Sequence, residues 1–450
     1  MVTDPIAAIA TPPGRSAIAV LRLSGRGAWD VAARVLVPFV TNPPRTLRRA
    51  RAIHAESGEQ LDDVLYAVFA APASYTGEDL VEVSTHGGLL APAEVLAALL
   101  AAGARLAAPG EFTRRAVANG KLDLLQAEAI GDLVEATSAA QRRAALGQLD
   151  RGLSDRIERL RAQLLELEAL LSYEIDFPEE DDGPVPAARV AAAVAQLREA
   201  LAGLLATSGE GERLRDGALA VIAGAPNVGK SSLFNALLGT ARAIVTEVPG
   251  TTRDAIEAHA VCGGFPFRLV DTAGLRERGD RIERLGIEVS RRYLAAADIV
   301  LCCIEAGRAV TPEERAFLDA LAVPAVVVRT KLDAVPGGAR WSPEAGEVAV
   351  SALTGDGIAA LRGRLAQDAF SGLIAQADVM PLVTRERHRV ALGRAMGEID
   401  AFARARAAAV DAAVAGTHLR AAVTALEDLI GLVTPDDVLD RVFAAFCVGK

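Results

Sequence analysis

The side chains best suited to chemistry lie in residues 224–231, which read Gly-Ala-Pro-Asn-Val-Gly-Lys-Ser. This is the G-x-x-x-x-G-K-S pattern of a phosphate-binding loop, whose backbone N–H groups surround phosphate oxygens. Lys230 would offer a positive charge to the outer phosphates, and the Ser231 hydroxyl would bind Mg²⁺. A predicted strand at 219–223 precedes the loop, and a predicted helix at 232–239 follows with its N-terminus toward the anion. The segment therefore predicts a nucleotide site.

Two segments further along the chain would complete the phosphate side of this site. Residues 250–254 read GTTRD, where a Thr hydroxyl can reach Mg²⁺ only when a γ-phosphate is present, and Thr252 is the candidate. Residues 269–274 read as a strand that ends in D-x-x-G. Asp271 would hold Mg²⁺ through water, and the Gly274 N–H would contact the γ-phosphate.

Two later segments indicate that the base is guanine. Residues 330–333 read Thr-Lys-Leu-Asp, and the Asp333 carboxylate can accept from the N1 and N2 donors of guanine, which adenine lacks. Residues 351–353, Ser-Ala-Leu, would supply a backbone N–H to guanine O6. The order of all five segments is typical of a GTPase. Because Thr330 stands where most GTPases have Asn, guanine selectivity is expected to depend mainly on Asp333.

These motifs do not identify the group that orients the attacking water. Leu275 follows D-x-x-G, at the position where Ras-like enzymes have a Gln for this purpose. A leucine side chain has no polar atom to hold a water molecule, and no arginine finger within the chain is evident. Another group must therefore orient the water.

Composition limits the size, partners and compartment of the protein. With 450 residues, 51% of them hydrophobic, the chain can form two or three domains. The net charge of −10 argues against general affinity for nucleic acid, so an RNA contact would need a local basic patch. No apolar run has the length of a membrane span, and the N-terminus does not resemble a signal peptide. Four cysteines without a C-x-x-C pair fit a cytoplasmic protein, and Cys302 and Cys303 are expected in the core of a strand.

Residues 1–118 are predicted to form an α+β domain. Strand patterns occur at 16–23, 64–69 and 80–84, and residues 43–51 read as a small basic loop. Arg22 and Glu82 are charges within strand patterns. From pattern alone, the simpler interpretation is that each lies on a solvated face of the sheet.

Helical patterns surround the nucleotide segment. Residues 119–214 contain a near-heptad apolar seam from Leu146 to Leu171, an acidic loop at 176–184, a helix at 187–205 and a turn at 208–211. Residues 215–373 alternate strand and helix, which is typical of a doubly wound sheet, and residues 374–450 are helical again. We favour one helical domain with the nucleotide domain inserted into it; two separate helical domains are the alternative.

Short segments along the whole chain carry a specific family resemblance. In the first 130 residues they are ATPPGR (10–15), LRLSG (21–25), YTGED (75–79), HGG (86–88), PGEFT (109–113), KLDL (121–124) and QAEAI (126–130). Later ones are IDFPE (175–179), Asn227 within the phosphate-binding loop, and the terminal FCVGK (446–450). On these residues the chain resembles, over its full length, the tRNA modification GTPases of the MnmE (TrmE) family.

The resemblance implies three parts and a reaction. An N-terminal domain similar to folate-dependent aminomethyltransferases would mediate homodimerisation and bind a one-carbon tetrahydrofolate, in the 5-formyl or 5,10-methylene form. A helical bundle domain would be assembled from the segments before and after an inserted Ras-like P-loop G domain. With a flavin-dependent partner, MnmG (GidA), in a heterotetramer or larger complex, the protein would add an aminomethyl or carboxymethylaminomethyl group. The acceptor would be C5 of the wobble uridine of certain tRNAs.

Residue by residue, the resemblance implies folate contacts at Arg22, Glu82, Lys121 and Lys450. A carboxylate that faces pterin N–H donors, with basic groups that face carboxylates, is consistent with such a ligand. This favours a binding role for Arg22 and Glu82 over the solvated-face interpretation. Cys447 would lie beside the same site, and its participation in catalysis is a further hypothesis.

The resemblance also supplies the missing parts of the GTPase. A K⁺ ion would replace the arginine finger and neutralise charge on the phosphates, held by Asn227, Thr246, Val248 and Thr251. Two G domains would dimerise across their nucleotides to close this site. Glu283 would orient the water, which makes Glu283 and Lys230 the expected catalytic residues. A purely structural role for Asn227 in the turn is the alternative.

The expected contacts with GTP and Mg²⁺ extend over all five motifs. Ser231 and Thr252 are the expected direct Mg²⁺ ligands. The residues expected to contact GTP are Asn227, Val228, Gly229, Lys230, Ser231, Ser232, Thr246, Glu247, Val248, Pro249, Gly250, Thr251, Thr252, Asp271, Thr272, Ala273, Gly274, Thr330, Lys331, Asp333, Ser351, Ala352 and Leu353.

Two other classes of GTPase share these motifs. A ribosome-assembly GTPase that acts as a switch is the alternative function, but the chain has no G-x-x-G loop in the setting of an RNA-binding KH module. A dynamin-like membrane GTPase is compatible with the helical seam, but no basic amphipathic face or apolar tip is evident. The folate-type N-terminal segments favour tRNA modification.

Overall fold

The computed structural model describes residues 4–176, 186–239, 257–271, 292–335, 343–375, 381–432, 436–444 and 446–449. Contacts between residues divide the chain into two units, residues 1–131 with 426–450 and residues 132–425. The C-terminal segment thus groups with the N-terminal domain. The helical segments before and after the nucleotide segment fall largely within the second unit. The domain boundaries predicted at 118, 214 and 373 stay predictions.

The first unit contains a seven-stranded sheet with the order β3-β4-β5-β6-β2-β1-β7. Neighbouring strands are antiparallel, except that β1 and β7 are parallel. The strands are β1 (Ile6–Ile9), β2 (Ile18–Ser24), β3 (Leu36–Val37), β4 (Arg48–Ile53), β5 (Gln60–Phe69), β6 (Leu80–His86) and β7 (Arg105–Leu106). Its helices are α1 (Ala28–Val35), α2 (Leu90–Ala101), α3 (Glu111–Ala118), most of α4 (Leu124–Glu135) and α16 (Asp436–Ala444).

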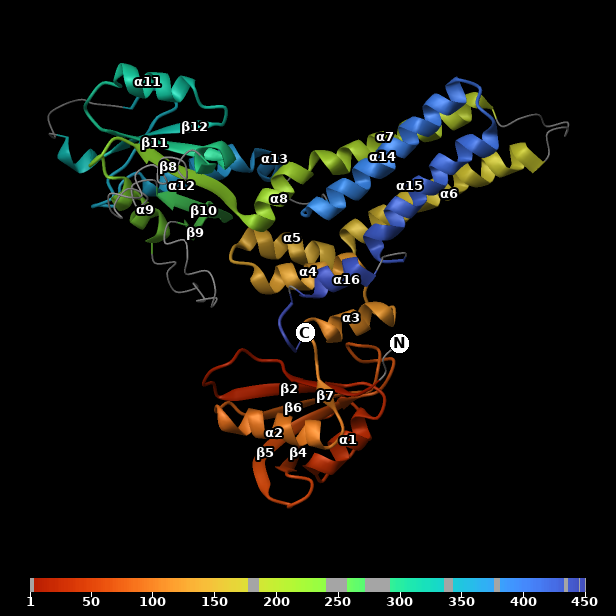
Figure 1. The fold of residues 1–450 in the computed structure, drawn as a ribbon. Helices are drawn as coiled ribbons and strands as arrows, with labels where there is room; N and C mark the ends of the chain where they lie inside the picture. Colours follow the sequence, from red (N-terminus) through yellow and green to blue (C-terminus); the bar gives the residue numbers. More distant parts are fainter. Residues whose placement is uncertain are drawn as a thin grey trace, which may run out of the picture. The chain divides into compact units, whose positions relative to one another are not determined.

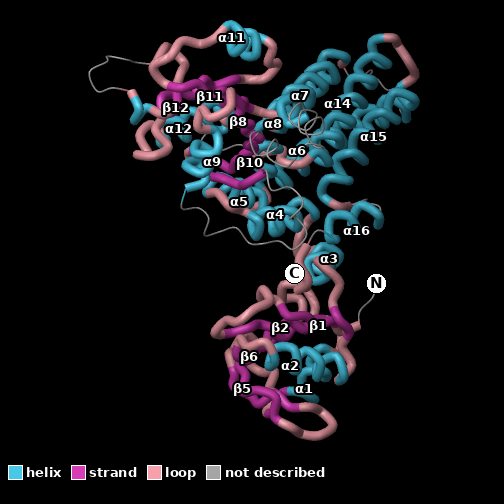
Figure 2. The backbone as a smooth tube through the Cα atoms, turned by 60° about the vertical axis from the view of Figure 1, so that its left-hand side comes forward, coloured by secondary structure: helices cyan, strands magenta, loops and turns pink. Residues whose placement is uncertain are grey.

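Alternation along the strands gives this sheet two covered faces. Leu21 and Leu23 of β2 face one core, against which α1 and α2 pack (Figure 2). Arg22 points to the opposite face, as successive side chains in a strand do. A smaller core of β1 and α3 residues includes Ile6 and Phe112.

The predicted strands at 16–23, 64–69 and 80–84 are confirmed as β2, β5 and β6, although β5 begins earlier, at Gln60. The basic loop predicted at 43–51 is wrong in its second half, because residues from Arg48 onward form β4. This strand buries Ala50 and Ala52 in alternation, and Arg49 forms an ion pair across the ladder with Asp63. Pairing with β5 therefore makes these residues a strand, although their high density of positive charge suggested a loop.

The last described residues of the chain lie on the N-terminal domain. Helix α16 packs against α3, and the Gly110 N–H donates to the Cys447 carbonyl at 3.4 Å. Gly449 has a φ of +98°, and a Cβ there would lie 2.6 Å from the Ile9 carbonyl oxygen. A larger residue would have to displace β1, so this glycine allows the chain end to approach the sheet closely.

The nucleotide segment forms a six-stranded sheet with the order β13-β12-β11-β8-β10-β9. All neighbours are parallel except β9, which is antiparallel to β10. The strands are β8 (Ala218–Gly224), β9 (Glu257–Cys262), β10 (Phe265–Asp271), β11 (Ile299–Glu305), β12 (Ala325–Thr330) and β13 (Val348–Ala349). The helical segments are α9 (Lys230–Leu238), α11 (Pro312–Asp319), η2 (Leu332–Ala334), α12 (Ile358–Ala369) and α13 (Ser371–Ala375).

Helices cover both faces of this sheet (Figure 1). Helices α9 and α12 pack on one face around Ile222, and α11 packs on the other around Val221. The predicted doubly wound sheet is therefore confirmed. Cys302 and Cys303 are buried in β11, as expected, and burial raises the pKa of the Cys302 thiol to about 11. These thiols are therefore protonated core side chains at neutral pH.

Helices α6, α7, α14 and α15 run side by side in a bundle (Figures 1 and 2). Helix α7 packs against α14, and Arg420 of α15 forms an ion pair with Glu168 of α6 at 2.7 Å. Helices from before and after the nucleotide segment thus share one bundle. The helices of this part are α5 (Ala139–Leu149), α6 (Gly152–Asp176), α7 (Ala187–Ala206), α8 (Ser208–Asp216), α14 (Glu386–Ala407) and α15 (Ala412–Ile430).

Two details of the predicted helices are wrong. The predicted seam is buried from Leu153 to Leu171 on α6, but Leu146 at its start is exposed, and Arg151, with a φ of +66°, separates α5 from α6. The turn predicted at 208–211 is instead the start of α8. There the Glu210 carboxylate accepts from the Gly372 and Leu373 N–H groups at 2.9 and 2.7 Å. This contact between segments distant in sequence helps to offset the low helix propensity of Gly209 and Gly211.

One helical stretch among the described residues, Ala187–Asp216, is long and apolar enough to cross a membrane by length and composition, although the sequence predicted no span. Its buried apolar residues lie at spacings of three and four, and α7 packs against α14 in the bundle. A core helix of a bundle meets the same criterion, so this is weak evidence for a span.

Leu164→Ala should destabilise the bundle by about 2–5 kcal/mol, because Leu164 is fully buried on α6 and its truncation leaves a cavity. The neighbouring change Leu165→Ala is the matched control. Leu165 is 37% exposed, so its loss should cost less than about 1 kcal/mol. Urea unfolding followed by circular dichroism at 222 nm measures both variants. Equal losses would contradict the buried face assigned to α6.

Candidate functional site

The phosphate-binding loop joins the carboxyl end of β8 to α9 in the middle of the sheet. The strand order reverses at β8, with β11 on one side and β10 on the other, and ligands of open α/β sheets bind at such a point. A Cβ at Gly224 would lie 2.5 Å from the Cys303 carbonyl oxygen, so this position requires glycine. Asn227 and Gly229 have φ values of +62° and +94°. Turns of this kind form anion-binding concavities from backbone N–H groups.

The structure brings together two residues expected on the magnesium side. The Ser231 hydroxyl donates to Asp271 Oδ2 at 2.7 Å, and hydroxyl and carboxylate oxygens are ligands that Mg²⁺ prefers. Lys230 is 7% exposed, and its ammonium donates to the Ala225 carbonyl at 2.7 Å. The ranges that the structure describes contain no cluster of three or more His, Cys, Asp or Glu able to hold a metal.

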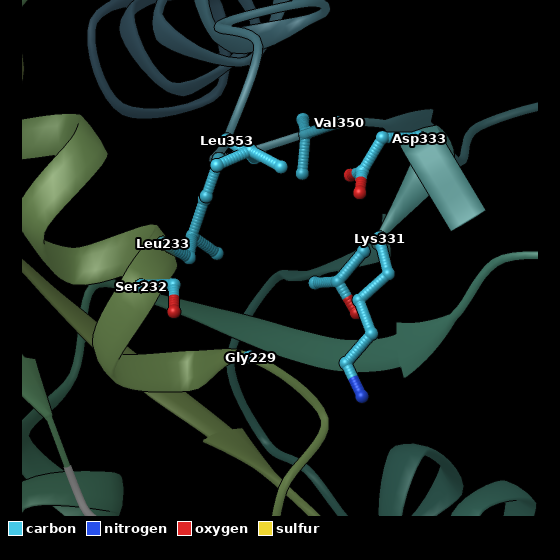
Figure 3. A pocket seen from close by; sticks show the side chains of 9 residues that line it. Gly229, Ser232, Leu233, Lys331, Asp333, Val350 and Leu353 are labelled. Carbon is cyan, nitrogen blue, oxygen red and sulfur yellow. The ribbon is translucent and has the colours of Figure 1, made fainter.

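A cavity of about 240 Å³ adjoins the loop on the side of β12. Figure 3 shows Asp333 and Lys331 after β12, with Val350 and Leu353 across from Ser232 and Leu233 of α9. The lining residues are Gly229, Ser232, Leu233, Thr330, Lys331, Asp333, Val350, Ala352 and Leu353. Seven of the residues predicted to contact GTP therefore line one cavity: Gly229, Ser232, Thr330, Lys331, Asp333, Ala352 and Leu353.

Hydrogen bonds orient the groups expected to read the base. The buried Ser351 hydroxyl donates to Asp333 Oδ1 at 2.5 Å. The Ser351 N–H donates to the Asp356 carbonyl at 2.9 Å, so the N–H expected to reach guanine O6 must come from Ala352 or Leu353. The Lys331 ammonium pairs with Glu305, and this contact lowers the pKa of the Glu305 carboxyl.

Several expected contacts lie outside the described residues, and the structure does not test them. They include the expected water-orienting Glu283, the Leu275 position and the terminal Lys450. The others are Thr246, Glu247, Val248, Pro249, Gly250, Thr251, Thr252, Thr272, Ala273 and Gly274.

A second polar site lies on the N-terminal sheet. Arg22 and Glu82 are direct partners in the β2–β6 ladder, and Arg22 Nη2 lies 2.8 Å from Glu82 Oε1. The Arg22 guanidinium also lies 5.0 Å from the centroid of the Tyr75 ring and 5.7 Å from that of Phe112. Its side chain is only 19% exposed, so the solvated-face interpretation is wrong for Arg22. Phe112 is fully buried and Tyr75 is partly buried, so the two rings hold the Arg22 guanidinium in place on the covered face of the sheet.

The other residues expected at this site lie on neighbouring segments. Lys121 Nζ donates to the Pro72 carbonyl at 3.1 Å, and Lys121 Cγ would lie 3.2 Å from a Cβ at Gly77. It thus flanks the loop that carries Tyr75. Cys447 is exposed, in the tail that reaches β1, and β1 pairs with β2 at Arg22.

Sequence reasoning did not assign roles to Tyr75 and Phe112. Both belong to the YTGED and PGEFT segments, so the signal was present in the motifs. Burial raises the pKa of the Tyr75 hydroxyl, which makes a hydrogen bond of 2.8 Å with Thr113. Tyr75 is therefore a neutral, fixed aromatic side chain over Arg22.

The loop, the Ser231–Asp271 pair and the cavity beside Asp333 together define a P-loop protein of the GTPase class. The family model described as "MnmE helical domain" matches residues 124–447, and the one described as "GTP-binding protein TrmE N-terminus" matches residues 5–121. The tRNA modification GTPase MnmE of Moorella thermoacetica is 42% identical over 467 residues, which cover 100% of both chains. That of Chloroflexus aurantiacus is 41% identical over 453 residues and covers 99% of this chain and 100% of its own.

The chain therefore belongs to the MnmE family of tRNA modification GTPases. The family resemblance expected from the short segments is confirmed, and with it the three-part fold class. Among solved structures, the G domain of the T. maritima FeoB iron transporter is 26% identical and covers 34% of this chain and 98% of its own. Its TM-score is 0.25, so the family assignment depends on the sequence relatives alone.

Proposed function

We propose that this protein hydrolyses GTP to support modification of tRNA at C5 of the wobble uridine. The observation that carries the proposal is the nucleotide site at the β8 switch point, in a chain that matches MnmE relatives over its whole length. The flavin-dependent protein MnmG would act with it on tRNA in the cytoplasm, as a heterotetramer or larger complex built on a homodimer. The added group would be aminomethyl or carboxymethylaminomethyl.

On the phosphate side, the N-terminus of α9 and the Lys230 ammonium would bind the β- and γ-phosphates. Lys230 must leave the Ala225 carbonyl to do so, and phosphate offers it a stronger, charged acceptor. When bound, Mg²⁺ would supply positive charge that neutralises the phosphate oxygens. Ser231 and Thr252 would hold it directly, and Asp271 through water.

On the base side, Asp333 would accept from guanine N1 and N2 because Ser351 holds its carboxylate in place. Adenine has no donor at either position, so the arrangement favours guanine. The backbone N–H of Ala352 or Leu353 would donate to guanine O6. These residues all lie at the cavity or next to it.

The proposed catalytic step uses a K⁺ ion and Glu283. K⁺ supplies positive charge beside the phosphates when bound, and Asn227 with Thr246, Val248 and Thr251 would hold it. Asn227 lies in the loop with its backbone in the left-handed region. Asparagine is also favoured there for conformational reasons, so its presence alone does not separate a ligand from a structural residue.

GTP turnover should rise at least tenfold when K⁺ replaces Na⁺ at equal ionic strength, and Asn227→Gly should abolish this rise while GTP binding remains. Glycine accepts the left-handed backbone and lacks the carboxamide side chain whose oxygen would bind K⁺, so it tests the ligand role without straining the turn. Phosphate release in each salt measures the effect. Equal wild-type rates in both salts would exclude the cation mechanism, and a K⁺-stimulated glycine variant would make Asn227 a turn residue.

In the N-terminal domain, we propose that Arg22, Glu82 and Lys121, with the terminal Lys450, bind a one-carbon tetrahydrofolate. The ion pair between Arg22 and Glu82 must rearrange for this, so that Glu82 accepts from pterin N–H donors. Tyr75, which is partly buried, would contribute an apolar contact, and the buried Phe112 ring would support Arg22 from behind. Cys447 stays a hypothesis for chemistry at this site.

Arg22→Gln should weaken 5-formyltetrahydrofolate binding about tenfold or more, because a charge-assisted hydrogen bond is lost. Arg49→Gln is the matched control. Arg49 lies on β4 of the same sheet in an ion pair with Asp63, and its side chain is 77% exposed. In the sheet, β5 and β6 separate β4 from β2, which carries Arg22. Titration calorimetry measures both. The folate site would be refuted if the wild-type protein bound no ligand or if both variants lost the same affinity.

Cells that lack this protein should accumulate unmodified wobble uridine, and the wild-type gene should restore modification where Lys230→Ala does not. The alanine variant removes the proposed phosphate contact. Mass spectrometry of tRNA nucleosides measures the outcome. Normal wobble uridine together with defective ribosomal subunits would instead favour the alternative, a ribosome-assembly GTPase.

A further inference from the structure

We propose that Thr330 positions the phosphate-binding loop and takes no part in the choice of base. This inference depends on the proposed guanine-nucleotide site and adds a role for a residue that departs from the usual GTPase sequence. Thr330 is the last residue of β12 and is 3% exposed. It lines the cavity, so contact with the base would be the first interpretation of its position.

The hydrogen bonds of Thr330 point to the loop instead. Its hydroxyl donates to the Val228 carbonyl at 2.5 Å, and the Ile304 carbonyl of β11 lies further away, at 3.4 Å. Val228 directly precedes Gly229, the N-cap of α9. The Thr330 side chain also lies 3.8 Å from where a Cβ at Gly229 would be. The end of β12 is thereby tied to the peptide that leads into the phosphate-binding N–H groups.

A count of donors separates this role from base recognition. A Thr hydroxyl has one hydrogen, whereas an Asn amide has two hydrogens and a separate acceptor. Asn at this position could bond the loop and keep a second donor for the base. In Thr330 the single hydrogen is used at Val228, so no donor remains for a purine. Base selection then depends on Asp333, which Ser351 orients.

The test is the affinity of the full-length protein for GDP, IDP and ADP, measured by calorimetry for the wild type, Thr330→Val and Thr330→Ser. IDP lacks the 2-amino group of guanine, so the GDP:IDP affinity ratio measures recognition of that group. ADP also lacks the O6 acceptor that a donor at position 330 could contact, so the GDP:ADP ratio includes recognition of O6. Valine has nearly the shape of threonine without the hydroxyl. Thr330→Val should weaken GDP and IDP equally, about tenfold each, because the buried Val228 carbonyl loses its partner. Thr330→Ser should restore both affinities to within about threefold of the wild type.

Asp333→Asn is the control for base recognition, and it should lower the GDP:IDP ratio. The inference is overturned if Thr330→Val changes the GDP:IDP or the GDP:ADP ratio more than about threefold, or if it binds GDP and IDP as the wild type does. The ratio from one preparation does not depend on the folded fraction, and Thr330→Ala provides a second variant without the hydroxyl. A wild-type protein that binds neither nucleotide would overturn the proposed function itself, and this inference with it.

Discussion

The nucleotide site depends on the close approach of β8 and β11 at Gly224. The two strands are parallel, with Gly224 opposite Cys303, and any side chain at 224 would meet the Cys303 carbonyl. Glycine therefore lets β8 remain paired to its last residue and then turn out of the sheet. The chain enters the loop at the place where the strand order reverses and returns as α9. A substitution here would separate the central strands and move the loop with them.

The parallel pairing brings the other polar groups to the same edge. Asp271 is the last residue of β10, and Thr330 is the last residue of β12, so both side chains stand where their strands stop. In a parallel sheet all carboxyl ends lie on one side. The contact of Asp271 with Ser231 and the contact of Thr330 with the loop both follow from this geometry. The apolar side chains on both faces of β8 are buried and stabilise the sheet, and the polar side chains expected to contact the nucleotide lie at its carboxyl edge.

Local sequence patterns predicted the nucleotide segment well because its expected binding residues lie in short motifs. The motifs within the described residues each lie at a strand end or a loop, and the apolar runs between them specify buried parallel strands. The errors arose where distant contacts decide local structure. Glu210 helps to hold α8 through Gly372 and Leu373, and β5 holds the arginine-rich β4 as a strand. The pairing of Arg22 with Glu82 required the order β6-β2, which no single segment contains. A charged residue within a strand pattern does not reveal which residue it pairs with or which aromatic rings pack against it.

Three hydroxyl groups each hold one part of the nucleotide site in position. Ser231 contacts Asp271, Ser351 contacts Asp333, and Thr330 contacts the backbone of Val228. Such neutral or singly charged hydrogen bonds contribute only about 1–3 kcal/mol each, too little to determine the fold. Their effect is directional, since each fixes one group that would face the ligand. Replacement of Asn by Thr keeps the tie to the loop and gives up a donor toward the base, because a hydroxyl has one hydrogen to offer. The hydrogen bond between β12 and the phosphate-binding loop is thereby kept, and the discrimination between purines is left to the Asp333 carboxylate and the backbone beside it.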